Sequence, residues 1–83
     1  MNSTPSAIKS KLIEIVGVTL GLPAEMITDN FSSDDCETWD SVRHVMLVLA
    51  IEESFGIAFE EEEIWATMSF PALAKAVEAR FAP

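Results

Sequence analysis

The sequence predicts an all-α fold, a bundle of four helices in which the third is short. Apolar side chains recur three and four residues apart, which is the spacing of a helix face and not the alternation of a strand. The 83-residue chain contains only 3 Gly and 4 Pro, so few positions are marked as turns. Hydrophobic residues make up 49% of the chain, enough for one core and hence one domain, residues 1–83.

The first helix is expected over residues 5–20. Thr4 is its predicted N-cap, and Pro5 suits the first helical position, where an N–H would have no partner anyway. Gly21 is suited to a left-handed helix stop. Gly17 is expected to destabilise this helix by about 1 kcal/mol relative to Ala. The expected buried face consists of Ile8, Leu12, Ile15, Val16 and Leu20.

Residues 22–40 form an unusually long connection, which is acidic and contains no Lys or Arg. The second helix follows it and is expected over residues 41–55. Asp40 is placed to cap this helix, because a carboxylate accepts hydrogen bonds from the free N–H groups of a first turn. Gly56 is suited to end it.

The last two helices are expected over residues 60–66 and 70–81. The first of these begins with glutamates, which favour the positive end of the helix dipole. Ser69 is the predicted cap of the second. The side chains expected to be buried by this last helix are Phe70, Leu73, Ala74, Val77 and Phe81.

The helix over residues 41–55 is apolar on two sides. At about 100° per residue, one side carries His44, Leu47, Val48, Ile51 and Phe55, and the nearly opposite side carries Val42, Val45, Met46 and Leu49. A small bundle cannot easily bury one helix all round, so we expect the second set to be exposed and to meet a partner. The alternative is a central helix that the other three cover completely.

The formal net charge is −9, from 14 acidic and 5 basic residues. This charge opposes binding to nucleic acid and favours a partner with a basic surface, although the acids also simply keep a small domain soluble. The one cysteine, Cys36, cannot form an internal disulfide, which fits a reducing compartment. No apolar run approaches the ~18 residues of a membrane span, and the N-terminus does not read as a signal peptide. We therefore expect a cytoplasmic monomer without membrane contact.

Catalytic and metal-binding patterns are weak. Ser41 and His44 are three residues apart on a helix, but the sequence has no nucleophile elbow and no evident orienting acid. Cys36 and His44 have no further Cys or His to complete a zinc site. In the acidic run that starts at Asp29, Phe31 and Asp34 occupy positions that a calcium loop reserves for a ligand and a glycine. We predict no catalytic residue and no metal site.

A short motif opens the second predicted helix, and a longer one closes it. The first is Asp40-Ser41-Val42, and the second is Ile51-Glu52-Glu53-Ser54-Phe55-Gly56-Ile57. Together with the acidic short helix and the chain length, this pattern resembles the acyl carrier protein family, whose attachment motif is Asp-Ser-Leu. The resemblance covers essentially the whole chain. It implies a four-helix bundle of the acyl carrier protein type.

The resemblance also implies a function. Ser41 would carry 4'-phosphopantetheine, which a phosphopantetheinyl transferase takes from coenzyme A with Mg²⁺, and the thiol of this arm would hold substrates as thioesters. Asp40 would be the motif residue and helix cap. The further partners implied are an acyl- or aminoacyl-loading ligase and a downstream synthase or transferase. The helix N-terminus suits a phosphate, and the chain itself would not be an enzyme.

The sequence departs from the usual carriers of fatty-acid synthesis at Trp39, Arg43 and Met46, and so looks more like stand-alone carriers of specialised pathways. Within the same resemblance, the residues expected at the partner surface are Val42, Arg43, Val45, Met46 and Leu49, and those expected at the mouth of a cargo pocket are His44, Leu47 and Val48. An apolar acyl chain would enter this pocket, whereas a polar aminoacyl group would stay outside. The alternative function is an unmodified small helical interaction module that uses the same apolar stripe.

Overall fold

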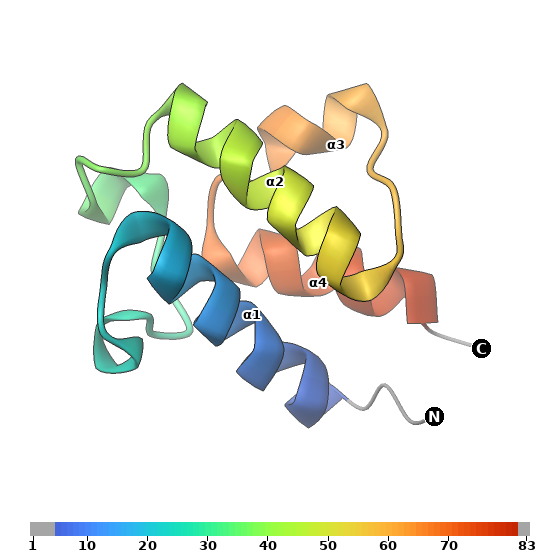
Figure 1. Ribbon diagram of the computed structural model, residues 1–83, viewed down its shortest axis with the longest axis horizontal. Helices are drawn as coiled ribbons and strands as arrows, with labels where there is room; N and C mark the ends of the chain where they lie inside the picture. Colours follow the sequence, from blue (N-terminus) through green and yellow to red (C-terminus); the bar gives the residue numbers. More distant parts are fainter. Residues whose placement is uncertain (1–4, 82–83) are drawn as a thin grey trace.

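The computed structural model describes residues 5–81, which form α1 (Pro5–Leu20), α2 (Ser41–Phe55), α3 (Glu61–Ala66) and α4 (Phe70–Phe81). Two short 3₁₀ turns, η1 (Ala24–Met26) and η2 (Ser33–Asp35), lie in the long connection between α1 and α2. α1 packs against both α2 and α4, and Figure 1 shows α3 on the other side of α2 from α1. The predicted fold class, an all-α bundle with a short third helix, is confirmed.

The core lies where α1, α2 and α4 face one another. Buried residues of the connecting segments also pack into this core, so the three long helices do not form it alone. Phe81, predicted to be buried, is 37% exposed because it is the last residue of α4, and its ring contacts that of Phe55. The buried hydrophobic residues are Ile8, Leu12, Val16, Leu20, Ile27, Phe31, Trp39, Leu47, Val48, Ile51, Phe59, Phe70, Leu73 and Val77.

Local capping explains where the helices begin and end. The Asp40 carboxylate accepts the Arg43 N–H at 2.9 Å, and Gly56 ends α2 at φ 67°. α3 begins at Glu61, one residue later than predicted, because Glu60 is its N-cap. The Glu60 N–H donates to the Glu63 carboxylate at 2.9 Å. The predicted cap Thr4 lies outside the described residues.

The long connection is fastened to the start of α4. Two apolar residues of this acidic segment, Ile27 and Phe31, are buried. The Phe70 N–H donates to the Phe31 carbonyl at 2.7 Å, and the Ser33 N–H donates to the Met68 carbonyl at 3.0 Å. These bonds hold the loop against the core, so the segment that leads into α2 has a defined position.

Close packing explains why a glycine occupies position 17 within α1. A Cβ atom at this position would lie 2.8 Å from the Leu22 carbonyl oxygen, a distance that side-chain carbons do not adopt. The Leu22 N–H in turn donates to the Gly17 carbonyl at 2.9 Å. The absence of a side chain at Gly17 therefore lets the chain fold back closely after α1, which offsets its poor helix propensity.

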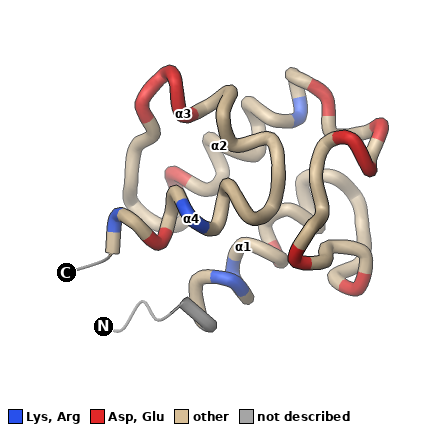
Figure 2. The backbone as a smooth tube through the Cα atoms, turned by 180° about the vertical axis from the view of Figure 1, so that it is seen from behind, with Lys and Arg blue, Asp and Glu red and all other residues tan. Residues whose placement is uncertain are grey.

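Charge is unevenly distributed. Figure 2 shows the acidic residues gathered along the long connection and at the start of α3. Within residues 5–81, two of them are in ion pairs, Asp29 with Lys9 and Glu63 with Arg80. The Arg80 guanidinium also donates to the Ala58 carbonyl at 3.1 and 3.2 Å. It also lies 4.8 Å from the centre of the Phe59 ring. Arg80 thus fastens the beginning of α3 to α4.

Across residues 5–81, no helix combines the length and the hydrophobicity that crossing a membrane requires.

Candidate functional site

Ser41 is the first residue of α2, and its side chain is exposed. Asp40, immediately before it, is engaged in the helix start: its carboxylate accepts the Arg43 N–H, and its carbonyl accepts the His44 N–H at 2.8 Å. The Ser41 hydroxyl is therefore displayed at the positive end of a helix whose first turn is already capped. This is an environment in which an anionic group attached to the hydroxyl is favoured.

Trp39 directly precedes the Asp40-Ser41 pair and anchors it to the core. Its side chain is buried and stacks on Phe31, with 5.7 Å between ring centres. Its indole Nε1–H donates to His44 Nδ1 at 3.1 Å. The residue before the pair and the residue one turn after it are thus bonded to each other, which fixes the start of α2.

This role of Trp39 does not follow from its being a departure from the usual carrier pattern. A large aromatic residue at the end of a polar loop, five positions before a histidine on an apolar helix face, is the signal that would have identified this contact.

His44 is completely buried and connects α2 to α3. Because Nδ1 accepts a hydrogen bond from Trp39, the proton of the neutral ring sits on Nε2, which donates to the Ile64 carbonyl. The Thr67 hydroxyl lies 3.4 Å from the same nitrogen. Burial lowers the pKa of His44, and the Ile64 carbonyl opposes this only in part. The ring is therefore a neutral, fully bonded bridge between the two helices.

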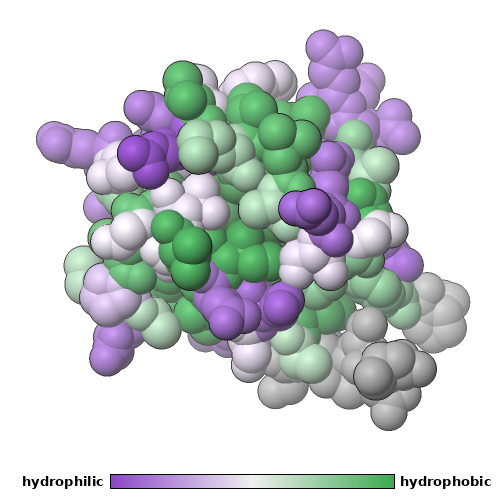
Figure 3. All heavy atoms as spheres, in the orientation of Figure 1, coloured by the Kyte–Doolittle hydropathy of each residue, from purple (hydrophilic) through white to green (hydrophobic). Residues whose placement is uncertain are grey.

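The apolar stripe of α2, which consists of Val42, Val45, Met46 and Leu49, is exposed as predicted. Val42 is 68% and Leu49 is 59% accessible, so α2 is not covered all round. Figure 3 shows hydrophobic side chains gathered over α2 on this face, with hydrophilic side chains around them. A patch of this kind on a small protein is typical of an interaction surface.

Arg43 is exposed and lies on the same helix as the stripe. Its guanidinium donates to the Thr19 carbonyl at 3.0 Å, near the end of α1. This bond satisfies one of the free carbonyl groups at a helix C-terminus and ties the start of α2 to α1. The predicted partner-surface residues therefore lie together on one side of α2. One of them, Arg43, also stabilises the fold through its hydrogen bond to α1.

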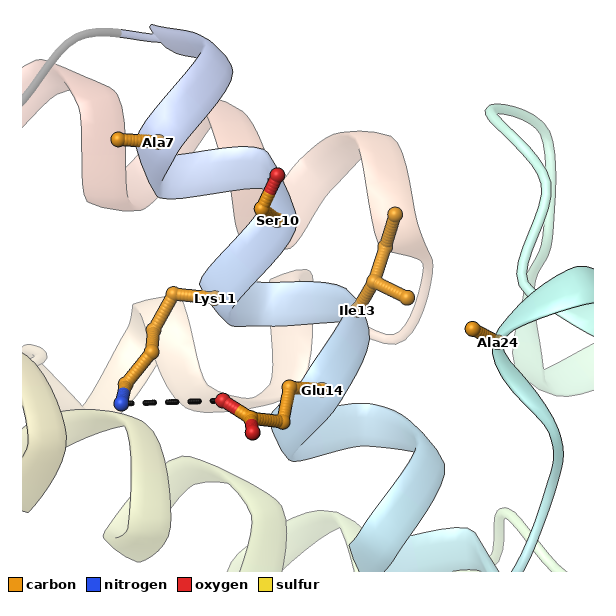
Figure 4. A pocket seen from close by; sticks show the side chains of 6 residues that line it. All are labelled: Ala7, Ser10, Lys11, Ile13, Glu14 and Ala24. Carbon is orange, nitrogen blue, oxygen red and sulfur yellow. Dashed lines mark ion pairs between the residues drawn. The ribbon is translucent and has the colours of Figure 1, made fainter.

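The three residues predicted at the mouth of a cargo pocket, His44, Leu47 and Val48, are all buried. Two surface cavities lie elsewhere. One, of about 640 Å³, lies on the outer side of α1; Figure 4 shows its lining side chains on α1, with Ala24 of η1 facing them. The other, of about 340 Å³, lies between α3 and α4 and is lined largely by alanines. None of the three residues lines either of these cavities.

A small acidic helical bundle that displays a serine at the capped start of its second helix has the architecture of a carrier domain. No protein-family model matches the chain. Among curated proteins, the chain is similar to the acyl carrier protein MbtL of Mycobacterium bovis and of Mycobacterium tuberculosis. Each is 30% identical over 81 residues, a match that covers 98% of this chain and 96% of the relative. The chain belongs to the acyl carrier protein family, and its role is that of a carrier protein.

Proposed function

We propose that this protein is an acyl or aminoacyl carrier in which Ser41 bears 4'-phosphopantetheine. The observation that supports this most strongly is the exposed Ser41 hydroxyl at the capped start of α2, directly after Asp40. When bound, the group supplies a thiol that holds a substrate as a thioester. The residues present fit it: the hydroxyl is accessible to a transferase, and the helix end favours the phosphate.

We also propose that the chain performs no catalysis of its own. His44 lies one turn after Ser41 and would be the natural general base. Both of its ring nitrogens are already hydrogen-bonded, one to Trp39 and one to Ile64, and the ring is buried. His44 is therefore not available as a base for Ser41, and we assign activation of the hydroxyl to the enzyme that attaches the arm.

The proposed partners are a phosphopantetheinyl transferase, an acyl- or aminoacyl-loading ligase, and a downstream synthase or transferase. Each must reach Ser41, and the exposed stripe of α2 is the apolar surface beside it. Figure 2 shows acidic residues along the connection that leads into α2 and at the start of α3, and this charge favours partners with basic rims. Arg43 is the one exposed basic side chain on α2, since His44 is buried, so we assign it to partner specificity.

The setting we propose is that of a stand-alone cytoplasmic monomer that serves a specialised pathway. The relatives named acyl carrier protein MbtL support an acyl cargo, and the departures at Trp39, Arg43 and Met46 support a specialised role. His44, Leu47 and Val48 border the route by which a cargo would enter the core. That route is closed while α3 remains bonded to His44 through Ile64 and to Arg80 through Glu63.

The test is the intact mass after incubation with coenzyme A, Mg²⁺ and a promiscuous phosphopantetheinyl transferase. Wild-type protein should gain the mass of one phosphopantetheine. Ser41→Ala should gain none while its circular dichroism spectrum stays unchanged, because the side chain is exposed. Ser32→Ala and Ser33→Ala are matched controls and should be modified like wild type. Modification that persists in Ser41→Ala would refute the assignment.

A second candidate is an unmodified helical interaction module, which the exposed stripe of α2 favours equally. It predicts that folded wild-type protein gains no mass in the same experiment and still binds a partner through Met46 and Leu49.

A further inference from the structure

A row of aromatic rings fills the space between the long connection, α2 and α3. Phe31 stacks on Trp39, Trp39 stacks on His44 with 6.1 Å between ring centres, and His44 packs against Trp65 at 5.9 Å. The row starts in the core and ends at the surface, where Trp65 is 50% exposed. It occupies the place where α3 would have to separate from α2 to admit a cargo.

Hydrogen bonds lock this row in place. The Trp39 indole N–H, the two nitrogens of His44 and the Ile64 carbonyl form a continuous chain of donors and acceptors. An alkyl chain that entered here would separate these groups and could not replace their hydrogen bonds. Inserting an alkyl chain between apolar side chains breaks no hydrogen bond. Inserting it here would leave buried polar groups without partners, which is unfavourable.

Ser41 is connected to the exposed end of the row through His44. His44 is one helical turn after Ser41 on the same side of α2, and Trp65 packs on His44. A flexible group attached to the Ser41 hydroxyl can therefore reach the open face of the Trp65 indole without entering the core. Indole faces bind apolar groups and amides well, and a large ring loses little conformational freedom when it does so.

We propose that Trp65 is an external platform for the arm and its cargo, and that the Trp39–His44–Ile64 hydrogen bonds keep the core closed to alkyl chains. The cargo class that follows is a short or polar acyl group, held on the surface. This inference rests on Ser41 as the attachment point. Burial, which lowers the pKa of His44, supports it by keeping the ring neutral and able to accept the Trp39 hydrogen bond.

The test compares protein loaded with an acetyl and with an octanoyl thioester, each verified by intact mass. We expect the two forms to melt at the same temperature. In NMR spectra, the indole N–H signal of Trp65 should shift on loading, while that of Trp39 should not. A higher melting temperature for the octanoyl form, with shifts at Trp39, Leu47 and Val48, would show that the chain enters the core and would overturn the inference.

A chemical version separates this inference from the proposed function. In a Cys36→Ser/Ser41→Cys double variant, methyl and octyl disulfides can be attached at position 41 without any transferase. Equal melting temperatures, with the Trp65 signal moving in the octyl form, support the closed core and the platform even if enzymatic modification of Ser41 fails. A melting temperature that rises with the octyl group refutes them even if enzymatic modification succeeds.

Single substitutions test the Trp65 platform and the closed core separately. Trp65→Ala should abolish the contact between the arm and α3, seen as loss of nuclear Overhauser effects between them, and Trp65→Phe should restore most of it. Phe81→Ala, which removes another partly exposed ring far along the chain, should leave those effects intact. His44→Leu should open the core, so that octanoyl loading now raises the melting temperature. An arm contact that survives Trp65→Ala would refute the platform.

Discussion

Leu47 and Leu49 are the same residue type, two positions apart on α2, yet their surroundings are opposite. Leu47 is 0% exposed and packs in the core, whereas Leu49 is 59% exposed. The difference comes from neighbours and not from hydropathy: α1, α3 and α4 cover one side of α2, and a bundle of this size has no element left for the other. The comparison teaches that one helix divides its apolar residues between folding and recognition.

The first prediction puts the same charge on each face. Leu47→Asp should lower the free energy of unfolding by about 4 kcal/mol or more, because it buries an unpaired carboxylate. A loss of this size approaches the whole stability of a small domain, so this variant should be largely unfolded. Leu49→Asp should change the free energy of unfolding by no more than about 0.5 kcal/mol. Urea denaturation followed by circular dichroism measures both, and similar losses would contradict the two-face interpretation.

The second prediction concerns the polar residue on the buried face. His44→Phe should lower the free energy of unfolding by about 2–4 kcal/mol, because the Trp39 N–H loses its acceptor and the ring no longer bonds Ile64. Trp39→Phe is the partner variant, and the double variant should cost less than the sum of the two single changes. Additive losses would mean that the bond between Trp39 and His44 contributes nothing.

The third prediction is a pH dependence with a defined sign. Burial holds the pKa of His44 below its ordinary value of about 6.5, so the unfolded chain takes up this proton first as the pH falls. The free energy of unfolding should therefore decrease from about pH 7 downward and level off once the pH passes the folded-state pKa. The side chains packed on the ring, those of Trp39, Trp65 and Thr67, are uncharged at these pH values.

Melting curves between about pH 7 and 5 measure this effect. His44→Gln should show a flatter profile in the same window. Glu63 does not interfere there, because Arg80 holds its pKa below the ordinary value of a glutamate, so its contribution is lost only at lower pH. An identical slope in wild type and His44→Gln would show that another group titrates.

The fourth and smallest prediction concerns charge around the exposed face. With a net charge of −9, self-repulsion should lower stability at low salt, and added NaCl or Mg²⁺ should raise the melting temperature. The Debye length is about 10 Å at 0.1 M salt, which is short enough to screen these acids from one another. The exposed pair between Lys9 and Asp29 weakens with salt, but such pairs contribute little. A melting temperature independent of salt would show that repulsion among the acidic residues does not lower the stability.

The sequence is a good guide where structure is local. Asp40, Gly56 and Ser69 were assigned to helix ends because capping depends on neighbours within a turn, and all three lie where expected. The two faces of α2 followed from helical spacing alone. Exposure of one face did not follow strictly, since it depends on how many other helices are present to cover it.

The remaining features depend on how distant segments meet. Trp39 is buried because the long connection brings it against Phe31 and His44. Its spacing from His44 hints at the second contact, but the path of the loop that buries the ring depends on distant segments. Arg80 bonds Glu63 and Ala58 across 17 and 22 residues, a pairing that spacing within a helix cannot reveal. The bridge from His44 to Ile64 likewise spans 20 residues and two helices. Such contacts decide whether the predicted cargo route is open, and sequence periodicity says nothing about them.

The central claim is that the exposed face of α2 serves the enzymes that act at Ser41. The most direct measurement is kcat/KM for phosphopantetheine transfer to Leu49→Asp, with Ala79→Asp on α4 as a control that adds the same charge elsewhere. We predict that Leu49→Asp keeps the wild-type melting temperature while kcat/KM falls at least about tenfold, equivalent to about 1.4 kcal/mol of lost recognition. Ala79→Asp should retain the wild-type rate. Equal kcat/KM for Leu49→Asp, Ala79→Asp and wild type would contradict the account.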